Sequence, residues 1–115
     1  MAILTSHTLN GTDGTHAGGI KVMFSQLGGE KIFETKMDEG GRLNEKIGSE
    51  QIDPDATYEL VFETGPYWIE RGYNQIMDQV VLRFKMQDPT ADYHMPVIIS
   101  PNSYSAWWSS SCQMG

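Results

Sequence analysis

Three histidines are the side chains of this sequence best suited to chemistry at neutral pH. His7 lies in a strand-like segment, His94 lies just before one, and His16 lies in a glycine-rich loop. An imidazole titrates near neutral pH, so it can accept a proton in one step and return it in the next. The residues alone leave two interpretations of His7 and His94 open: an acid–base pair, or ordinary strand histidines with satisfied hydrogen bonds. For His16 they indicate a solvated loop residue.

Other reactive groups lack the spacing that familiar chemistries need. His7, His94 and Cys112 have no short-range spacing of the kind found in zinc sites. The serines at 109–111 have no Gly-x-Ser-x-Gly elbow around them, which indicates a polar tail. Residues 40–42 (GGR) lack the spacing and the lysine of a phosphate loop and are typical of a turn with a solvated arginine. We therefore predict neither a metal nor a cofactor.

Two adjacent tryptophans lie at the end of the last segment that has a strand-like pattern. Trp107 and Trp108 follow Tyr104 on what is expected to be the last strand. Successive side chains of a strand point to opposite faces, so one indole lies on each face. Two interpretations stay open at this point. One indole packs in the core and the other in a subunit interface, or one of them lines a ligand pocket.

The elements that must position these residues are short strands. Alternation of period two, or clusters of β-branched and aromatic residues between turn-forming residues, predicts strands over residues 2–9, 20–25, 31–35, 58–63, 80–86, 96–99 and 104–108. Pro96 is then expected at a strand start or on an edge. Thr64, Pro66 and Gly72 predict one short helix over residues 66–72. Seven or eight short strands indicate an all-β sandwich, in one domain over residues 1–115.

Composition excludes several classes of protein. The 115 residues are 39% hydrophobic and 20% charged. The net charge is -7, and the chain has only 8 lysines and arginines. So few cations argue against nucleic-acid binding. No apolar run approaches the ~20 residues of a membrane span, and we predict no membrane association. With one cysteine and no visible secretory signal, we expect a cytoplasmic protein.

Four motifs together carry a specific resemblance. They are residues 58–65 (YELVFETG), residues 93–101 (YHMPVIISP) followed by Tyr104-Ser105, residues 6–10 (SHTLN) and Gly41-Arg42. From about residue 2 to residue 110 the chain resembles the transthyretin family. Within that family it is closer to the 5-hydroxyisourate hydrolases than to the hormone carriers. Some members of the family are peroxisomal, but the end of this chain is not a Ser-Lys-Leu address.

The resemblance implies a transthyretin-like fold, an assembly and a catalytic set. It implies a homotetramer, a dimer of dimers, with sites in a channel across the dimer–dimer interface. The two histidines and the arginine that are catalytic in the family match His7, Arg42 and His94. In the family, a water activated by histidine adds to a ring carbonyl of a cyclic urate derivative, and the ring opens. An arginine can stabilise the oxyanion that forms.

The chain departs from the family mainly in its tail. The hydrolases end in Tyr-Arg-Gly-Ser, where this chain has Trp107, Trp108, Ser109 and Ser110. Losing the arginine removes a positive charge suited to an anionic substrate, and two indoles favour stacking on an apolar ring. We expect Trp107, Trp108, Tyr104 and Ser110 to bind the substrate. Smaller departures are Asn10 for an aspartate, His16 for a proline and Asp92 for a second histidine.

Three functions follow from these observations. The first is a hydrolase-like enzyme with altered specificity for a more apolar, aromatic cyclic substrate, which opens or closes a ring in a specialised biosynthetic pathway. The second is an ordinary 5-hydroxyisourate hydrolase of urate catabolism. The third is a non-catalytic carrier of a small hydrophobic ligand. Because a binding channel has no need of His7, Arg42 and His94 together, the carrier is the least favoured.

Overall fold

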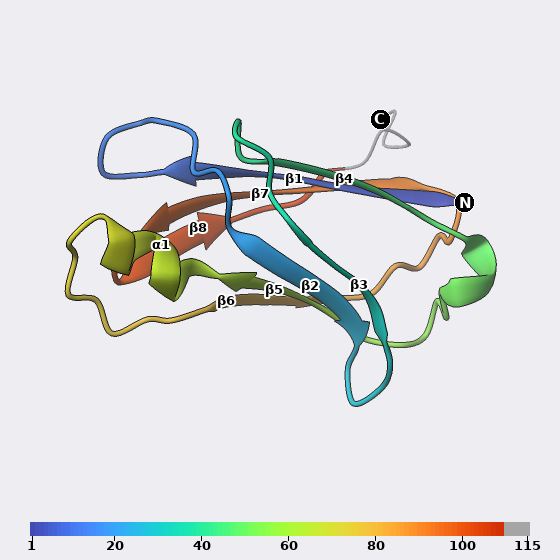
Figure 1. Cartoon of the computed structure of the whole chain (residues 1–115). Coiled ribbons are helices and arrows are strands. Elements are labelled where there is room, and N and C mark those ends of the chain that lie inside the picture. The colour runs from blue at the N-terminus through green and yellow to red at the C-terminus, as the bar shows by residue number, and fades with distance from the viewer. Residues whose placement is uncertain (110–115) are drawn as a thin grey trace.

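Two four-stranded sheets stack face to face in the computed structural model, which describes residues 1–109 (Figure 1). Eight strands, one α-helix and one 3-10 helix make up the described chain. The predicted β-sandwich is therefore confirmed. Ser110, expected to bind the substrate, and Cys112 lie outside the described residues.

The first sheet holds all the strands that matter for the predicted catalytic residues. Its order is β4-β1-β7-β8, formed by Arg42–Ile47, Ala2–Asn10, Asp92–Ser100 and Ser103–Ala106. β1 and β7 run parallel, and the other two pairs are antiparallel. The N-terminal strand thus lies inside the sheet, between β4 and β7.

The second sheet is antiparallel throughout. Its order is β3-β2-β5-β6, formed by Lys31–Lys36, Lys21–Gln26, Tyr58–Glu63 and Val80–Phe84. The helix α1, Thr64–Glu70, follows β5, and the 3-10 helix η1 covers Ser49–Gln51. No helix in residues 1–109 is long and apolar enough to cross a membrane.

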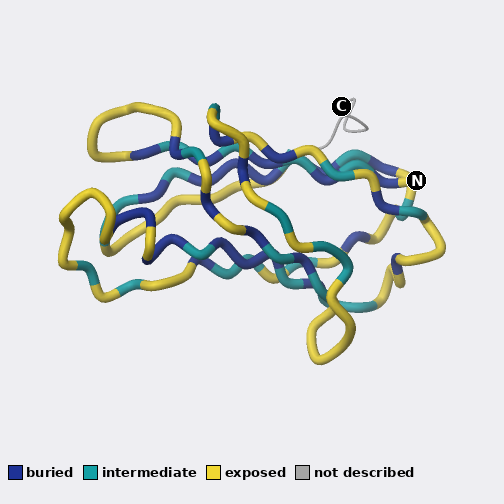
Figure 2. The backbone as a smooth tube through the Cα atoms, viewed as in Figure 1, coloured by how far each residue is buried: buried dark blue, intermediate teal, exposed yellow. Residues whose placement is uncertain are grey.

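The core lies between the sheets, as the buried stretches of the inner faces show (Figure 2). β1 alternates strictly, with every even-numbered residue from Ala2 to Asn10 buried. Its buried polar side chains are satisfied: the Ser6 hydroxyl donates to the Met95 carbonyl at 2.6 Å, and Asn10 Nδ2 donates to the Tyr67 hydroxyl at 3.1 Å. The odd-numbered residues of β1, including His7, are left on the outer face.

The predicted helix is confirmed, with a different start. The residue before it is Glu63, which makes no capping bond with its side chain, and Thr64 is the first helical residue rather than the cap. Its end follows the prediction. Gly72 has φ +83°, and the amides of Gly72 and Tyr73 donate to the carbonyls of Ile69 and Trp68. This is the bonding of a Schellman motif.

Two details of the first sheet differ from the sequence-based expectation. Pro96 lies within β7, a central strand, and not at a strand start or on an edge strand. The amide of Trp107 donates to the Pro96 carbonyl at 3.4 Å, so the proline nitrogen faces the end of β8, where the ladder is broken. The strand β4 was not expected at all, and Arg42 is its first residue.

Candidate active site

Two adjacent rows of side chains cross the outer face of the first sheet. Arg42 pairs with His7, His7 with Pro96, and Pro96 with Trp107 in the first row. The second row consists of Asn44, Thr5, His94 and Ser109. Neighbouring strands lie about 4.8 Å apart, so β4 and β7 flank β1 closely. The fold therefore brings His7, Arg42 and His94 together on one face.

A rigid turn fixes the position of Arg42. The Asp38 carboxylate accepts hydrogen bonds from the backbone nitrogens of Gly40 and Arg42, both at 2.9 Å. Gly41 has φ +74°, and a Cβ on it would lie 2.5 Å from the Thr8 carbonyl oxygen. Only glycine allows β4 to start this close to β1. The arginine side chain itself is exposed.

His94 is oriented by the residue beside it on β1. Nδ1 of His94 lies 2.7 Å from the Thr5 hydroxyl oxygen. The hydroxyl also lies 3.4 Å from the Tyr93 carbonyl oxygen, to which it can donate. When it does, Nδ1 carries the proton of the neutral ring and donates to the hydroxyl, and Nε2 keeps its lone pair. The sequence reasoning missed Thr5, although it is two residues from His7 and therefore on the same face.

His7 has a neighbour that the sequence did not indicate. Nε2 of His7 and Nδ1 of His16 are 2.8 Å apart, and the ring centroids are 4.9 Å apart. His16 is exposed, as expected of a loop residue, but it contacts the site. The only sequence signal is the spacing: the loop after β1 is short enough to fold back along the strand.

The electrostatics of the site favour neutral imidazoles. Burial lowers the pKa of His94 below its ordinary value of 6.5, and the charge of Arg42 lowers it further. Burial and then the charge of Arg42 lower the pKa of His7, to which His16 and His94 add, while a hydrogen bond with the Gly40 backbone opposes them. Both histidines are therefore neutral at pH 7 and able to accept a proton.

The aromatic residues of the tail lie on different faces. The last strand, β8, ends at Ala106 and not at Trp108 as predicted, so both tryptophans lie just beyond it. Trp107 continues the first row on the outer face and is 50% exposed. Trp108 has the opposite orientation, and its ring lies 5.9 Å from that of Tyr93, which faces the core. Tyr104 pairs with the buried Ile99, so it also belongs to the inner side, at the edge, and is 42% exposed. Of the predicted binding residues described, only Trp107 shares a face with His7 and His94.

Ser109 is a further member of this face. It was expected to belong to a polar tail, but it exchanges two backbone hydrogen bonds with His94, each 2.9 Å long. Its side chain therefore lies next to that of His94 on the outer face. Among residues 1–109, no group of three or more His, Cys, Asp and Glu side chains is placed to hold a metal ion.

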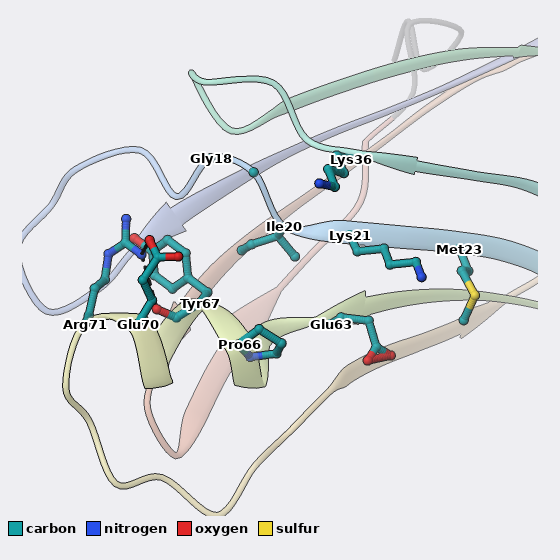
Figure 3. A pocket seen from close by; sticks show the side chains of 11 residues that line it. Gly18, Ile20, Lys21, Met23, Lys36, Glu63, Pro66, Tyr67, Glu70 and Arg71 are labelled. Carbon is teal, nitrogen blue, oxygen red and sulfur yellow. Dashed lines mark hydrogen bonds and ion pairs between the residues drawn. The ribbon is translucent and has the colours of Figure 1, made fainter.

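A hollow elsewhere on the molecule has a different lining. A pocket of about 630 Å³ lies between α1 and the beginning of β2 (Figure 3). Lys21, Lys36, Tyr67 and Arg71 are among the side chains around it, and none of the histidines is. The guanidinium of Arg71 lies 3.6 Å from the centroid of the Tyr67 ring. The pocket is thus separate from the two rows on the first sheet.

The fold and this face define a β-sandwich protein with two histidines and an arginine grouped on one outer sheet face. The model of the HIUase/Transthyretin family matches residues 4–108. The chain belongs to this family, which confirms the resemblance carried by its motifs.

Similar proteins include 5-hydroxyisourate hydrolases and a transthyretin. The 5-hydroxyisourate hydrolase of Pseudomonas aeruginosa is 33% identical over 114 residues, covering 93% of this chain and 90% of the relative. The solved 5-hydroxyisourate hydrolase of Klebsiella pneumoniae is 26% identical, with a TM-score of 0.79, and covers 94% of this chain and 99% of that one. Sea bream transthyretin in complex with thyroxine is 25% identical, with a TM-score of 0.83, and covers 97% and 98%.

Proposed function

We propose that the chain is a hydrolase-like enzyme acting on a small cyclic substrate, with His7, Arg42 and His94 as its catalytic residues. The observation that carries this proposal is the gathering of two imidazoles and one guanidinium from three neighbouring strands on one face. The lowered pKa of both histidines supports it, because a neutral imidazole is the form that acts as a base. Similarity to proteins named 5-hydroxyisourate hydrolase points to the same class.

The proposed reaction is the hydrolytic opening of a ring. A neutral imidazole takes a proton from water while the water oxygen bonds to a ring carbonyl carbon. Arg42 stabilises the negative charge on the carbonyl oxygen. The carbonyl then re-forms, the ring C–N bond breaks, and the leaving nitrogen takes the proton from the imidazolium. His94 suits the base role, because Thr5 holds its Nδ1 and leaves Nε2 free.

The substrate we propose has an apolar aromatic part. Trp107 lies in the same row as His7 and Arg42 and is half-exposed. It belongs to the tail segment in which the hydrolases have a tyrosine and an arginine. An indole there favours stacking on a flat apolar ring over pairing with an anion. Such a substrate fits a specialised biosynthetic pathway, in which ring closure by the same residues is an alternative to ring opening. An ordinary hydrolase of urate catabolism remains the second candidate, favoured by the relatives' names.

The assembly we propose is a homotetramer. The face with His7 and His94 is open in the single chain, and the exposed indole of Trp107 lies on it. A second copy facing this sheet would cover that indole and enclose a channel over the site. Light scattering should give about four times the mass of one chain. A stable monomer at micromolar concentration would remove the enclosed channel from the proposal.

The decisive experiment is a turnover assay. Purified protein is tested with 5-hydroxyisourate and with cyclic amides that carry an aromatic group. For whichever substrate turns over, we expect His7→Asn and His94→Asn each to lose on the order of 10²–10⁴ in rate. Lys46→Gln, an exposed change on β4, is the matched control. Unchanged rates in both histidine variants would make these residues structural. Ligand binding without turnover would instead indicate a carrier, as sea bream transthyretin with thyroxine suggests.

A further inference from the structure

His16 and His7 form a histidine pair at the edge of the proposed site. Nε2 of His7 lies 2.8 Å from Nδ1 of His16, and the planes of the two rings make an angle of 30°. His7 is half-buried on β1, whereas His16 is exposed. We propose that His16 is a positioning residue for His7 and passes protons between His7 and solvent. The inference rests on the proposed function for its kinetic consequence, but the pair itself can be tested without a substrate.

The backbone fixes His16 beside β1. The amide of Asn10 donates to the Thr15 carbonyl at 2.8 Å, and the amide of Ala17 donates to the Thr8 carbonyl at 2.9 Å. These bonds lie on either side of His16 and continue the pairing along β1 beyond Arg42, the first residue of β4. The loop between is tightened by Asp13, whose carboxylate accepts bonds from the backbone and the hydroxyl of Thr15. The ring contact is therefore a consequence of sheet geometry and not of a free loop.

The hydrogen bond between the two rings allows a proton to pass from His7 through His16 to water. With His7 donating from Nε2 to Nδ1 of His16, Nδ1 of His7 is the nitrogen that takes up a proton from the site, and the Gly40 backbone then accepts a hydrogen bond from it. His7 then gives its Nε2 proton to His16 and is neutral again, and His16 releases its own Nε2 proton to water. The reverse sequence returns one proton from water to the site. Each passage moves one proton and reverses the direction of the hydrogen bond between the rings.

The groups around His7 disfavour a positive charge on its own ring. Arg42 on β4 and His94 on β7 both disfavour a positive charge on His7, and the Gly40 backbone is the opposing hydrogen-bond partner. A proton taken up by His7 is therefore readily passed on, and His16 is exposed to the water that receives it. After this passage His7 is neutral and carries its proton on Nδ1, so the reverse passage restores Nδ1 as a base.

The pair predicts a specific NMR signature. In the wild-type protein, the chemical shift of His7 Nε2 should report the hydrogen bond between the rings, and the pKa of His7 should lie below its ordinary value. His16→Phe keeps a ring but removes both nitrogens, and should raise the pKa of His7, because the charge of His16 no longer lowers it. Thr15→Ala, which loosens the loop without touching the rings, should leave the titration of His7 unchanged. An unchanged His7 titration in His16→Phe would overturn the pairing.

The kinetic test separates this inference from the proposed function. For a substrate that the wild type turns over, His16→Phe and His16→Asn should both lower kcat on the order of tenfold, less than loss of a residue that transfers the proton itself. Added imidazole should restore part of the rate, and the pH profile should shift with the titration of His7. Full activity in His16→Asn would overturn proton passage. Inactivity of the wild type would overturn the function while the titration still decides the pair.

Discussion

Asp38 and Arg42 are joined twice across the turn that begins β4. The Asp38 carboxylate accepts a hydrogen bond from the Arg42 backbone nitrogen at 2.9 Å, and the Asp38 backbone nitrogen donates to the Arg42 carbonyl at 3.0 Å. The proposed cation of the site is thus held at its backbone, while its side chain stays free to meet a substrate. The relationship makes Asp38 a residue that positions Arg42 without approaching the substrate.

Replacement of Asp38 by alanine should separate stability from positioning. We expect Asp38→Ala to lower the free energy of unfolding by about 1 kcal/mol, since two backbone hydrogen bonds are lost at an exposed turn. Activity should fall more than stability explains, because Arg42 loses its fixed place. Urea denaturation and turnover measure the two effects. Glu39→Ala, the exposed neighbour, is the control, and equal behaviour of the two variants would contradict the positioning role.

Gly41→Ala should be more harmful than the same change at Gly14. Both glycines have positive φ, +74° and +76°, so both variants carry backbone strain of about 1–2 kcal/mol. Only at Gly41 does the new Cβ meet oxygens, at 2.5 Å from Thr8 and 3.0 Å from Ala17, while nothing lies within 4 Å at Gly14. Thermal unfolding should show the larger loss for Gly41→Ala. Similar losses would mean that β4 can move away without cost.

Stability should fall as the pH drops through the histidine range. The pKa of His7 and that of His94 lie below 6.5 in the folded chain, because of burial and Arg42, so the unfolded chain binds more protons below that pH. Their contribution is complete above 6.5 and is lost as the pH falls through the lowered pKa values. Denaturation at several pH values should show this slope, and His94→Asn should flatten it. Bonds from Lys21 and Lys31 lower the pKa of Glu34 to about 2, so its contribution is lost only in much stronger acid.

Trp107 and Trp108 should respond differently to substitution by arginine. Trp107→Arg places a cation on the face of His7 and should weaken binding of an apolar substrate while improving turnover of urate-like anions. Trp108→Arg removes a ring that packs near Tyr93 and should mainly lower stability. Binding by calorimetry and melting temperatures distinguish the two. Efficient turnover of 5-hydroxyisourate by the wild type, unchanged in both variants, would contradict the altered specificity.

The strands that the sequence predicted are those with strong alternation or large apolar residues. The predicted bounds of β5 match the structure to the residue, since Tyr58, Leu60 and Phe62 are all buried and Glu59 and Glu63 lie on the other face. β4 escaped prediction because it buries only Leu43 and Ile47, and its exposed side chains give no alternating apolar signal. A strand at the edge of a sheet needs few buried residues. Its partner β1 supplies the hydrogen bonds that define it.

The candidate site could be predicted in its members but not in its arrangement. The motifs indicated His7, Arg42 and His94, yet their meeting depends on the parallel pairing of β1 and β7, which no local pattern encodes. The contact of His16 with His7 likewise depends on a loop folding back along β1. Alternation did predict that the two tryptophans differ in face. Which of them faces the histidines required the register of β7 and β8.

The interior position of β1 has a consequence for how the protein is made. Thr5 and His94 are neighbours although they are 89 positions apart in the sequence. The strand β1 is synthesised first, but it can pair with β7 only near the end of synthesis. Until β7 emerges, one edge of β1 has no partner and can pair with another chain. Such long-range pairing also slows folding. The face that carries His7 and His94 can therefore form only when almost the whole chain has been synthesised, and a chain cut short before Asp92 retains an aggregation-prone edge.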